Sequence, residues 1–209
     1  MRFNEQGRSM IEMLGVLAIV GVLSVGGIAG YSKAMAKFNT NKAIDQVNMI
    51  ATNVRTMFAS QRGYEGLSVD IAIKANLIPS ELYDAKSTGN YSGGAISNPF
   101  GGTTFVSAAK NSTDNDSFVI AMDKIPQAAC VAMATTEWGS EAGGGLLALK
   151  IEATGTNAAS TTGTTNATAA LTAAAGTYVA GHATYGFPVS VAAATGACAA
   201  TNTFTWKYL

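Results

Sequence analysis

Residues Gly7–Tyr31, GRSMIEMLGVLAIVGVLSVGGIAGY, form the stretch that decides how this chain folds. Positions 13–32 carry no charged side chain. As an α-helix they extend roughly 30 Å, which is about the thickness of the hydrocarbon core of a bilayer. The segment can therefore span a membrane. Glu12 precedes it directly, although a carboxylate in a membrane helix costs about 2.5–3.5 kcal/mol, which is unusual for a plain anchor.

The leader that precedes this segment differs from an ordinary secretory signal. Such a signal has a basic start, a short apolar centre and a small-residue cleavage site beyond that centre. Here the leader, MRFNEQG, is polar without being strongly basic, and its small residue, Gly7, stands before the apolar run. Cleavage after Gly7 would leave the hydrophobic segment on the product, which would begin at Arg8.

This arrangement resembles the class III signal of type IV prepilins and the related pseudopilins. Gly7 is followed by four residues, then by Glu12 at the fifth position of the product, then by an unbroken apolar helix. The resemblance implies that a membrane peptidase cuts between Gly7 and Arg8 and methylates the new amine of Arg8. It also implies that Glu12 serves assembly of a filament. A generic signal anchor is the alternative for this stretch.

Helical periodicity continues beyond the membrane segment. Apolar residues recur every three or four positions, with polar residues between them: Phe38, Ile44, Val47, Ala51, Val54 and Phe58. One helix is therefore expected from about Ser9 to about Gln61, ending at Gly63. The expected organisation is a leader at 1–7, a membrane and polymerisation half of the helix at 8–32, an amphipathic half at 33–62 and a globular head at 63–209.

The head is expected to be built from short elements around an antiparallel sheet. Short helices are expected after Ser68, over 69–75, and after Pro126, over 127–136 with Cys130 on the inner face. Strands are expected at 103–108, 117–122 and 146–151. The fold class is α+β, with the long N-terminal helix packed on the sheet.

The C-terminal part combines a stretch of low complexity with aromatic strands. Residues 153–176 are almost entirely small and polar, and are interpreted as a surface excursion or a loop without a role. Strand residues are expected around Tyr178, Tyr185, Phe187 and Val189. At 203–208 aromatic residues alternate with polar ones, which predicts a half-buried antiparallel strand. An aromatic platform for nucleic acid is disfavoured because no basic patch flanks it.

Cys130 and Cys198 are the two cysteines of the chain, and both lie beyond the membrane segment. If the head is exported, it enters an oxidising compartment, where two cysteines are expected to pair. The expected bond bounds the C-terminal region of the head. Two buried free thiols are the alternative if the head stays in the cytoplasm.

Three pieces of the head resemble those of type IVb pilins, especially thin-pilus major subunits. They are NPFGGTTFV at 98–106, IPQAACVAMA at 125–134 and the late Cys198. The resemblance implies a homopolymeric filament. It further implies a prepilin peptidase, pilus assembly machinery in the inner membrane and membrane lipid as partners. The subunit would wait in the inner membrane with its head in the periplasm, and the assembled pilus would be extracellular.

Catalytic and metal-binding patterns are missing from the sequence. The single histidine, His182, has no cysteine or carboxylate cluster at ligand spacing, and Asp114 and Asp116 read as a solvated turn. With 13 basic and 13 acidic residues there is no net pull toward nucleic acid. The expectation is a structural protein without enzymatic activity, cofactor or metal.

The leading function is the major subunit of a type IV pilus that serves adhesion, aggregation or mating-pair contact. One alternative is a type II secretion pseudopilin. The other is a single-pass, membrane-anchored protein whose head binds a ligand without polymerising.

Overall fold

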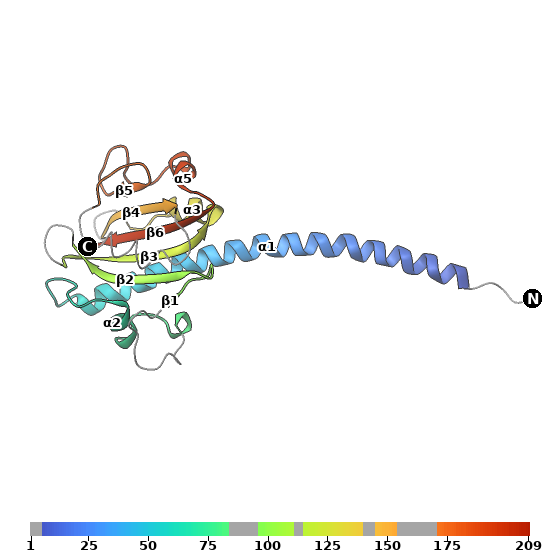
Figure 1. The fold of residues 1–209 in the computed structure, drawn as a ribbon, viewed down its shortest axis with the longest axis horizontal. Coiled ribbons are helices and arrows are strands. Elements are labelled where there is room, and N and C mark those ends of the chain that lie inside the picture. Colours follow the sequence, from blue (N-terminus) through green and yellow to red (C-terminus); the bar gives the residue numbers. More distant parts are fainter. Residues whose placement is uncertain (1–5, 84–95, 111–114, 140–144, 154–170) are drawn as a thin grey trace, which may run out of the picture. The chain divides into compact units, whose positions relative to one another are not determined.

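The computed structural model describes residues 6–83, 96–110, 115–139, 145–153 and 171–209. The chain divides into two compact units, Met1–Asn39 and Thr40–Leu209. Helix α1, Gln6–Phe58, provides most of the first unit and continues into the second (Figure 1). It contains no proline, so no interior hydrogen bond is forced open along its length.

The end of α1 differs from the expected one. The helix stops at Phe58, before Gly63. Gly63 instead lies where the chain crosses another segment, because a Cβ at this position would meet the backbone oxygen of Asn115 at 2.5 Å. The next amide, that of Tyr64, donates a hydrogen bond to the same oxygen at 2.7 Å. Gly63 is therefore required for close approach, and the expectation that it caps the helix is wrong.

The C-terminal part of α1 buries one face in the head, as the periodicity predicts. Its buried apolar residues recur at helical spacing: Ala43, Val47, Ile50, Ala51, Val54 and Phe58. Phe38, which the pattern included in this face, belongs to the first unit and is exposed. The packed face thus begins after Asn39, later than periodicity alone indicates.

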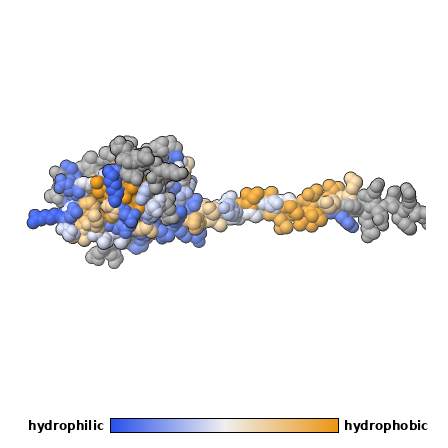
Figure 2. All heavy atoms as spheres, turned by 90° about the horizontal axis from the view of Figure 1, so that it is seen from below, coloured by the Kyte–Doolittle hydropathy of each residue, from blue (hydrophilic) through white to orange (hydrophobic). Residues whose placement is uncertain are grey.

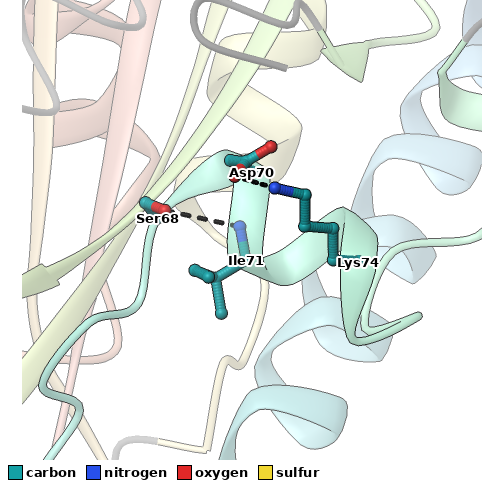
Figure 3. A network of polar contacts seen from close by, with 4 residues as sticks. All are labelled: Ser68, Asp70, Ile71 and Lys74. Atoms are coloured by element: carbon teal, nitrogen blue, oxygen red, sulfur yellow. Dashed lines mark hydrogen bonds and ion pairs between the residues drawn. The ribbon is translucent and has the colours of Figure 1, made fainter. Parts of the chain in front are cut away.

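The short helix α2, Val69–Lys74, follows the expected capping pattern. The Ser68 hydroxyl accepts a hydrogen bond from the amide of Ile71 at 3.4 Å, and Lys74 pairs with Asp70 at 2.7 Å one turn away (Figure 3). Ala72 and Ile73 point into the core. A single 3-10 turn, η1, follows at Ser80–Leu82.

In the part of the head that the structure describes, six strands form an antiparallel sheet in the order β1-β2-β3-β6-β4-β5 (Figure 1). The C-terminal strand β6 pairs with β3 on one side and with β4 on the other. The α+β architecture is therefore as expected. The bounds are β1 Ile96–Ser97, β2 Thr103–Ala109, β3 Ser117–Pro126, β4 Leu146–Ala153, β5 Thr177–Val179 and β6 Thr201–Tyr208.

Strand β6 is buried on both faces, so the expectation of a half-buried strand is wrong. Phe204, Trp206 and Tyr208 belong to the main core, as alternation predicts. Lys207 on the opposite face is 0% exposed, and its ammonium donates a hydrogen bond to the backbone oxygen of Lys110. Burial lowers the pKa of Lys207, and nearby Asp116 opposes that shift. Strand β6 is central in the sheet, a position that its own sequence does not reveal.

Helix α3 confirms one expected element, and the next segment contradicts another. Helix α3, Gln127–Ala134, follows Pro126 and buries Cys130. The expected strand residues around Tyr185, Phe187 and Val189 lie instead in turns and in the approach to helix α5, Val191–Ala197. Strand β5 ends at Val179, whose amide donates a hydrogen bond to the backbone oxygen of Tyr185 at 2.7 Å. The chain therefore turns back after Val179 and does not continue as a strand. Most of the low-complexity stretch, 154–170, lies outside the described residues.

Tyr208 stacks on Phe118 with ring centroids 5.3 Å apart, and the Arg55 guanidinium lies 4.8 Å over its ring. Its buried hydroxyl has no hydrogen-bond partner among the described residues. Burial raises the pKa of Tyr208 well above its usual range, and Arg55 acts in the opposite direction. The pKa of Tyr208 is higher in the folded state than in the unfolded state. The contribution of the protonated hydroxyl to the free energy of unfolding is therefore complete below about pH 10 and is lost as the pH rises further.

We therefore expect the free energy of unfolding to fall above about pH 10, and Tyr208→Phe to remove up to ~1.4 kcal/mol of that fall per pH unit. The contribution of Lys207 to the free energy of unfolding changes in the opposite direction. Because the pKa of Lys207 is lowered in the folded state, this contribution rises with pH until about pH 10.4. Urea unfolding at pH 8 and pH 11 measures the difference. Tyr31→Phe, at an exposed position, is the control. If the free energy of unfolding fell equally from pH 8 to pH 11 in Tyr208→Phe and in the wild type, Tyr208 would not be the source of the alkaline destabilisation.

Candidate membrane and assembly site

The first part of α1 is apolar on all sides and exposed in the single chain. Figure 2 shows a nearly continuous hydrophobic surface along it. The exposed large apolar residues include Met10, Ile11, Met13, Leu14, Val16, Leu17, Ile19, Val20, Val22, Leu23, Val25 and Ile28. A helix that is hydrophobic all round is normally buried in a membrane or in a large assembly. Within the described residues, α1 is the one helix long and apolar enough to cross a membrane.

Glu12 lies near the start of this surface, between Ile11 at 73% and Met13 at 63% exposure. Gly7 and Arg8 lie in the first turn of α1, which begins at Gln6. Arg8 and Glu12 are thus four residues apart in one helix. Four residues correspond to roughly 6 Å along the axis. The structure therefore places the expected cleavage position one turn before the expected assembly residue.

No close contact within the single chain requires glycine at the glycine positions of this segment. A Cβ added at Gly15, Gly21, Gly26, Gly27 or Gly30 would meet nothing within 4 Å. Glycine weakens a helix by about 1 kcal/mol relative to alanine. Gly26 and Gly30 have the spacing that lets two membrane helices approach closely.

The two cysteines form the expected disulfide. Cys130 in α3 and Cys198, the C-cap residue of α5, are bonded, with their Cα atoms 5.9 Å apart and a sequence separation of 68. Both cysteines are buried in the main core. The Gln127 side-chain amide also donates to the Cys198 backbone oxygen at 3.1 Å. The bond therefore joins the two small helices that flank the C-terminal region.

Sequence reasoning missed a buried polar turn at 98–103. The Asn98 side chain accepts hydrogen bonds from the amides of Phe100 and Gly102, at 2.9 and 3.0 Å, and donates to the Asp123 backbone oxygen at 2.8 Å. The Asp123 carboxylate accepts from the amide and hydroxyl of Thr103, at 2.7 and 2.9 Å. The Asn98-Pro99 pair is itself a local turn signal, but nothing in the neighbouring sequence identifies Asp123 as the partner of this turn. This network organises the turn before β2.

No cluster of three histidine, cysteine or acidic residues that could hold a metal ion occurs within the described ranges. Asp114 lies outside those ranges. The Nδ1 atom of His182 accepts hydrogen bonds from the amides of Thr184 and Tyr185, at 3.2 and 3.0 Å. The histidine thus stabilises its own turn.

Comparison with known proteins identifies the class to which this fold belongs. The family described as PilS N terminal matches residues 37–209. The chain therefore belongs to this family, and it is a type IVb pilin.

Relatives and a solved structure agree with this assignment. The major structural subunit of the bundle-forming pilus of Escherichia coli is 29% identical over 140 residues, covering 67% of this chain and 69% of the relative. The toxin coregulated pilin of Vibrio cholerae is 27% identical over 135 residues, 64% of this chain and 58% of the relative. A crystal structure of TcpA, a type IV pilin from Vibrio cholerae El Tor biotype, shares the fold, with a TM-score of 0.53 and 14% identity. The match covers 82% of this chain and 99% of TcpA. The Escherichia coli relative is described as a structural subunit, in agreement with the expected lack of enzymatic activity.

Proposed function

We propose that this pilin is the repeating structural subunit of an extracellular type IV pilus. The observation that carries the proposal is the exposed apolar part of α1, which a soluble monomer could not leave in water. Membrane lipid covers this surface before assembly, and the same helices of other subunits cover it in the filament. The relatives described as pilus subunits support this role.

The proposed pathway begins with a precursor in the inner membrane, whose head lies in the periplasm. A prepilin peptidase cuts between Gly7 and Arg8 and methylates the amine of Arg8, and assembly machinery in the membrane then adds the subunit to the filament. The leader supports this order because its small residue stands before the apolar run. Adhesion, aggregation or mating-pair contact is the proposed purpose of the pilus.

The first expected result concerns processing. Subunits from filaments sheared off the cell surface should begin at Arg8 and carry one methyl group, which intact-mass measurement detects. Gly7→Leu should leave an uncut precursor in the membrane, because the family's peptidase accepts a small residue before the cut. Glu5→Gln, which changes the leader away from the cleavage position, is the matched control and should be processed normally. Assembled protein that retains Met1 would refute the proposed cleavage between Gly7 and Arg8.

A further inference from the structure

The end of the apolar segment that is nearer the head carries the features of a membrane interface. Counted from Met13, Tyr31 lies roughly 27 Å along the helix, Lys33 roughly 30 Å and Lys37 roughly 36 Å. The hydrocarbon core of a bilayer is about 30 Å thick, and the headgroup layers bring the total to about 40–45 Å. If Met13 marks one boundary of the core, both lysines fall in the headgroup layer of the opposite leaflet. Tyr31 lies at its inner edge, where aromatic residues are enriched.

The charged side chains between Glu12 and Asp45 are all positive. Between Glu12 and Asp45 the sequence contains no acidic residue. Lys33 and Lys37 are four residues apart, so their side chains lie on the same face of α1. Both are exposed, and neither has a hydrogen bond or an ion pair with any described residue. A like-charged pair at this spacing disfavours its own helix, and an anion bound between the two ammonium groups would remove that repulsion.

Tyr31 lies on the other side of the helix. At about 100° per residue, it is separated from the lysines by roughly 120–160° around the axis. Its side chain is 66% exposed in the single chain. The three residues therefore surround α1 within roughly 9 Å of depth, with cations on one side and an amphipathic ring on the other. Binding of an acidic peptide would explain the two lysines but not Tyr31. A lipid interface explains all three residues and their depth along the helix.

We propose that Lys33 and Lys37 form a binding site for the phosphates of anionic phospholipids in the leaflet from which the head emerges, and that Tyr31 anchors the helix at the same interface. This inference rests on the proposed membrane-anchored state before assembly. The lysines bind the phosphates and gather anionic lipid around the waiting subunit, while the tyrosine fixes the depth of the helix at the interface. The subunit leaves these lipids when it enters the filament.

The test measures lipid selectivity of the full chain in vesicles of phosphatidylcholine with 20% phosphatidylglycerol. Spin-labelled versions of both lipids report, by electron paramagnetic resonance, the relative association constant of each lipid with the protein. We expect phosphatidylglycerol to be preferred at low salt, by up to about fivefold for each lysine. Lys33→Gln/Lys37→Gln should bring the ratio close to one. So should 1 M salt, where the screening length is about 3 Å.

Two matched variants separate this site from general charge. Arg62→Gln/Lys74→Gln removes the same charge from exposed positions of the head and should leave the selectivity unchanged. Lys33→Arg/Lys37→Arg keeps the charge and should retain it. Equal association of both lipids with the wild type, or an unchanged ratio in the double lysine variant, would overturn the inference. In that outcome, acidic residues of a neighbouring subunit become the partner to test.

A carbonate wash of the vesicles distinguishes this failure from failure of the proposed function. A chain that remains in the vesicles but shows no lipid preference overturns the lipid site alone. A chain that the wash removes is not membrane-anchored, which overturns the proposed anchoring together with this inference.

Discussion

Cys198→Ala should lower the free energy of unfolding of the head by about 4 kcal/mol, which is a large part of the stability of a typical domain. The disulfide closes a loop with a sequence separation of 68, and the chain-entropy model assigns that stabilisation to a loop of this length. The loop contains β4, β5 and α5, and most of the low-complexity stretch lies within it as well. Losing the bond should therefore release the edge of the sheet at β4 and β5 first.

Urea unfolding of the full chain in detergent measures this effect through tryptophan fluorescence. Trp138 and Trp206 are buried with ring centroids 5.1 Å apart, so their emission reports the head core. Cys130→Ala and the double alanine variant should lose about as much as Cys198→Ala, because all three remove the same bond. Reductant should destabilise the wild type and leave the variants unchanged. A loss below about 1 kcal/mol would show that the bond contributes little.

The parts of the fold that the sequence predicts are those coded by local periodicity. The long helix and its buried face around Val47, Ile50 and Val54 follow from residues three and four positions apart. The strands β2 and β3 and the cap of α2 at Ser68 are local signals as well. These elements have the expected type, with ends that differ by a few residues.

The features that were missed depend on contacts between distant residues. Strand β6 is buried on both faces because it lies between β3 and β4, and neither neighbour is adjacent to it in sequence. Lys207 is buried against an oxygen of Lys110, 97 residues away. Asn98 and Asp123 are separated by 25 residues. A period-two pattern shows which residues share a face, but not whether a second layer covers the other face.

The candidate site has the same division between local and distant information. Gly7, Arg8 and Glu12 are predicted as site residues because their spacing resembles that of the prepilin signal, and α1 places them within one turn or so of each other. The disulfide required an argument about the compartment, because sequence separation does not bring two cysteines together. Lys33 and Lys37 are visible in the sequence, but their proposed contact with lipid depends on the rise of the helix, which places them at the depth of the headgroups.

The exposed apolar surface of α1 raises a question of specificity. Lipid tails and the apolar side chains of other subunits offer similar surroundings, so transfer from membrane to filament gains little from the hydrophobic effect. Close packing at the glycines and charge interactions must then determine where a subunit docks. Among residues 9–32, Glu12 carries the one formal charge.

Glu12→Val should abolish surface filaments while leaving insertion and cleavage normal. In the filament core, burial of a carboxylate is expensive unless a positive charge lies against it. We expect the processed amine at Arg8 of a neighbouring subunit to supply that charge, since methylation would leave the nitrogen protonated. The amine lies roughly 6 Å along the axis from Glu12 of its own chain. A stagger of about one turn between subunits therefore brings one chain's amine to the next chain's carboxylate.

Removing one partner of such a buried pair costs about 3–5 kcal/mol, because the other charge stays buried. Filaments in the sheared fraction should therefore fall at least ~100-fold, measured by immunoblot against the membrane pool. Glu12→Gln keeps the size and should also fail, whereas Ile11→Val, a conservative change beside it, should assemble normally. If Glu12 acted only on the dipole of its own helix, the loss would be about 0.3–1 kcal/mol and filaments would persist. Ordinary pilus abundance with valine or leucine at position 12 would therefore refute charge pairing, even though the pilin fold would stand.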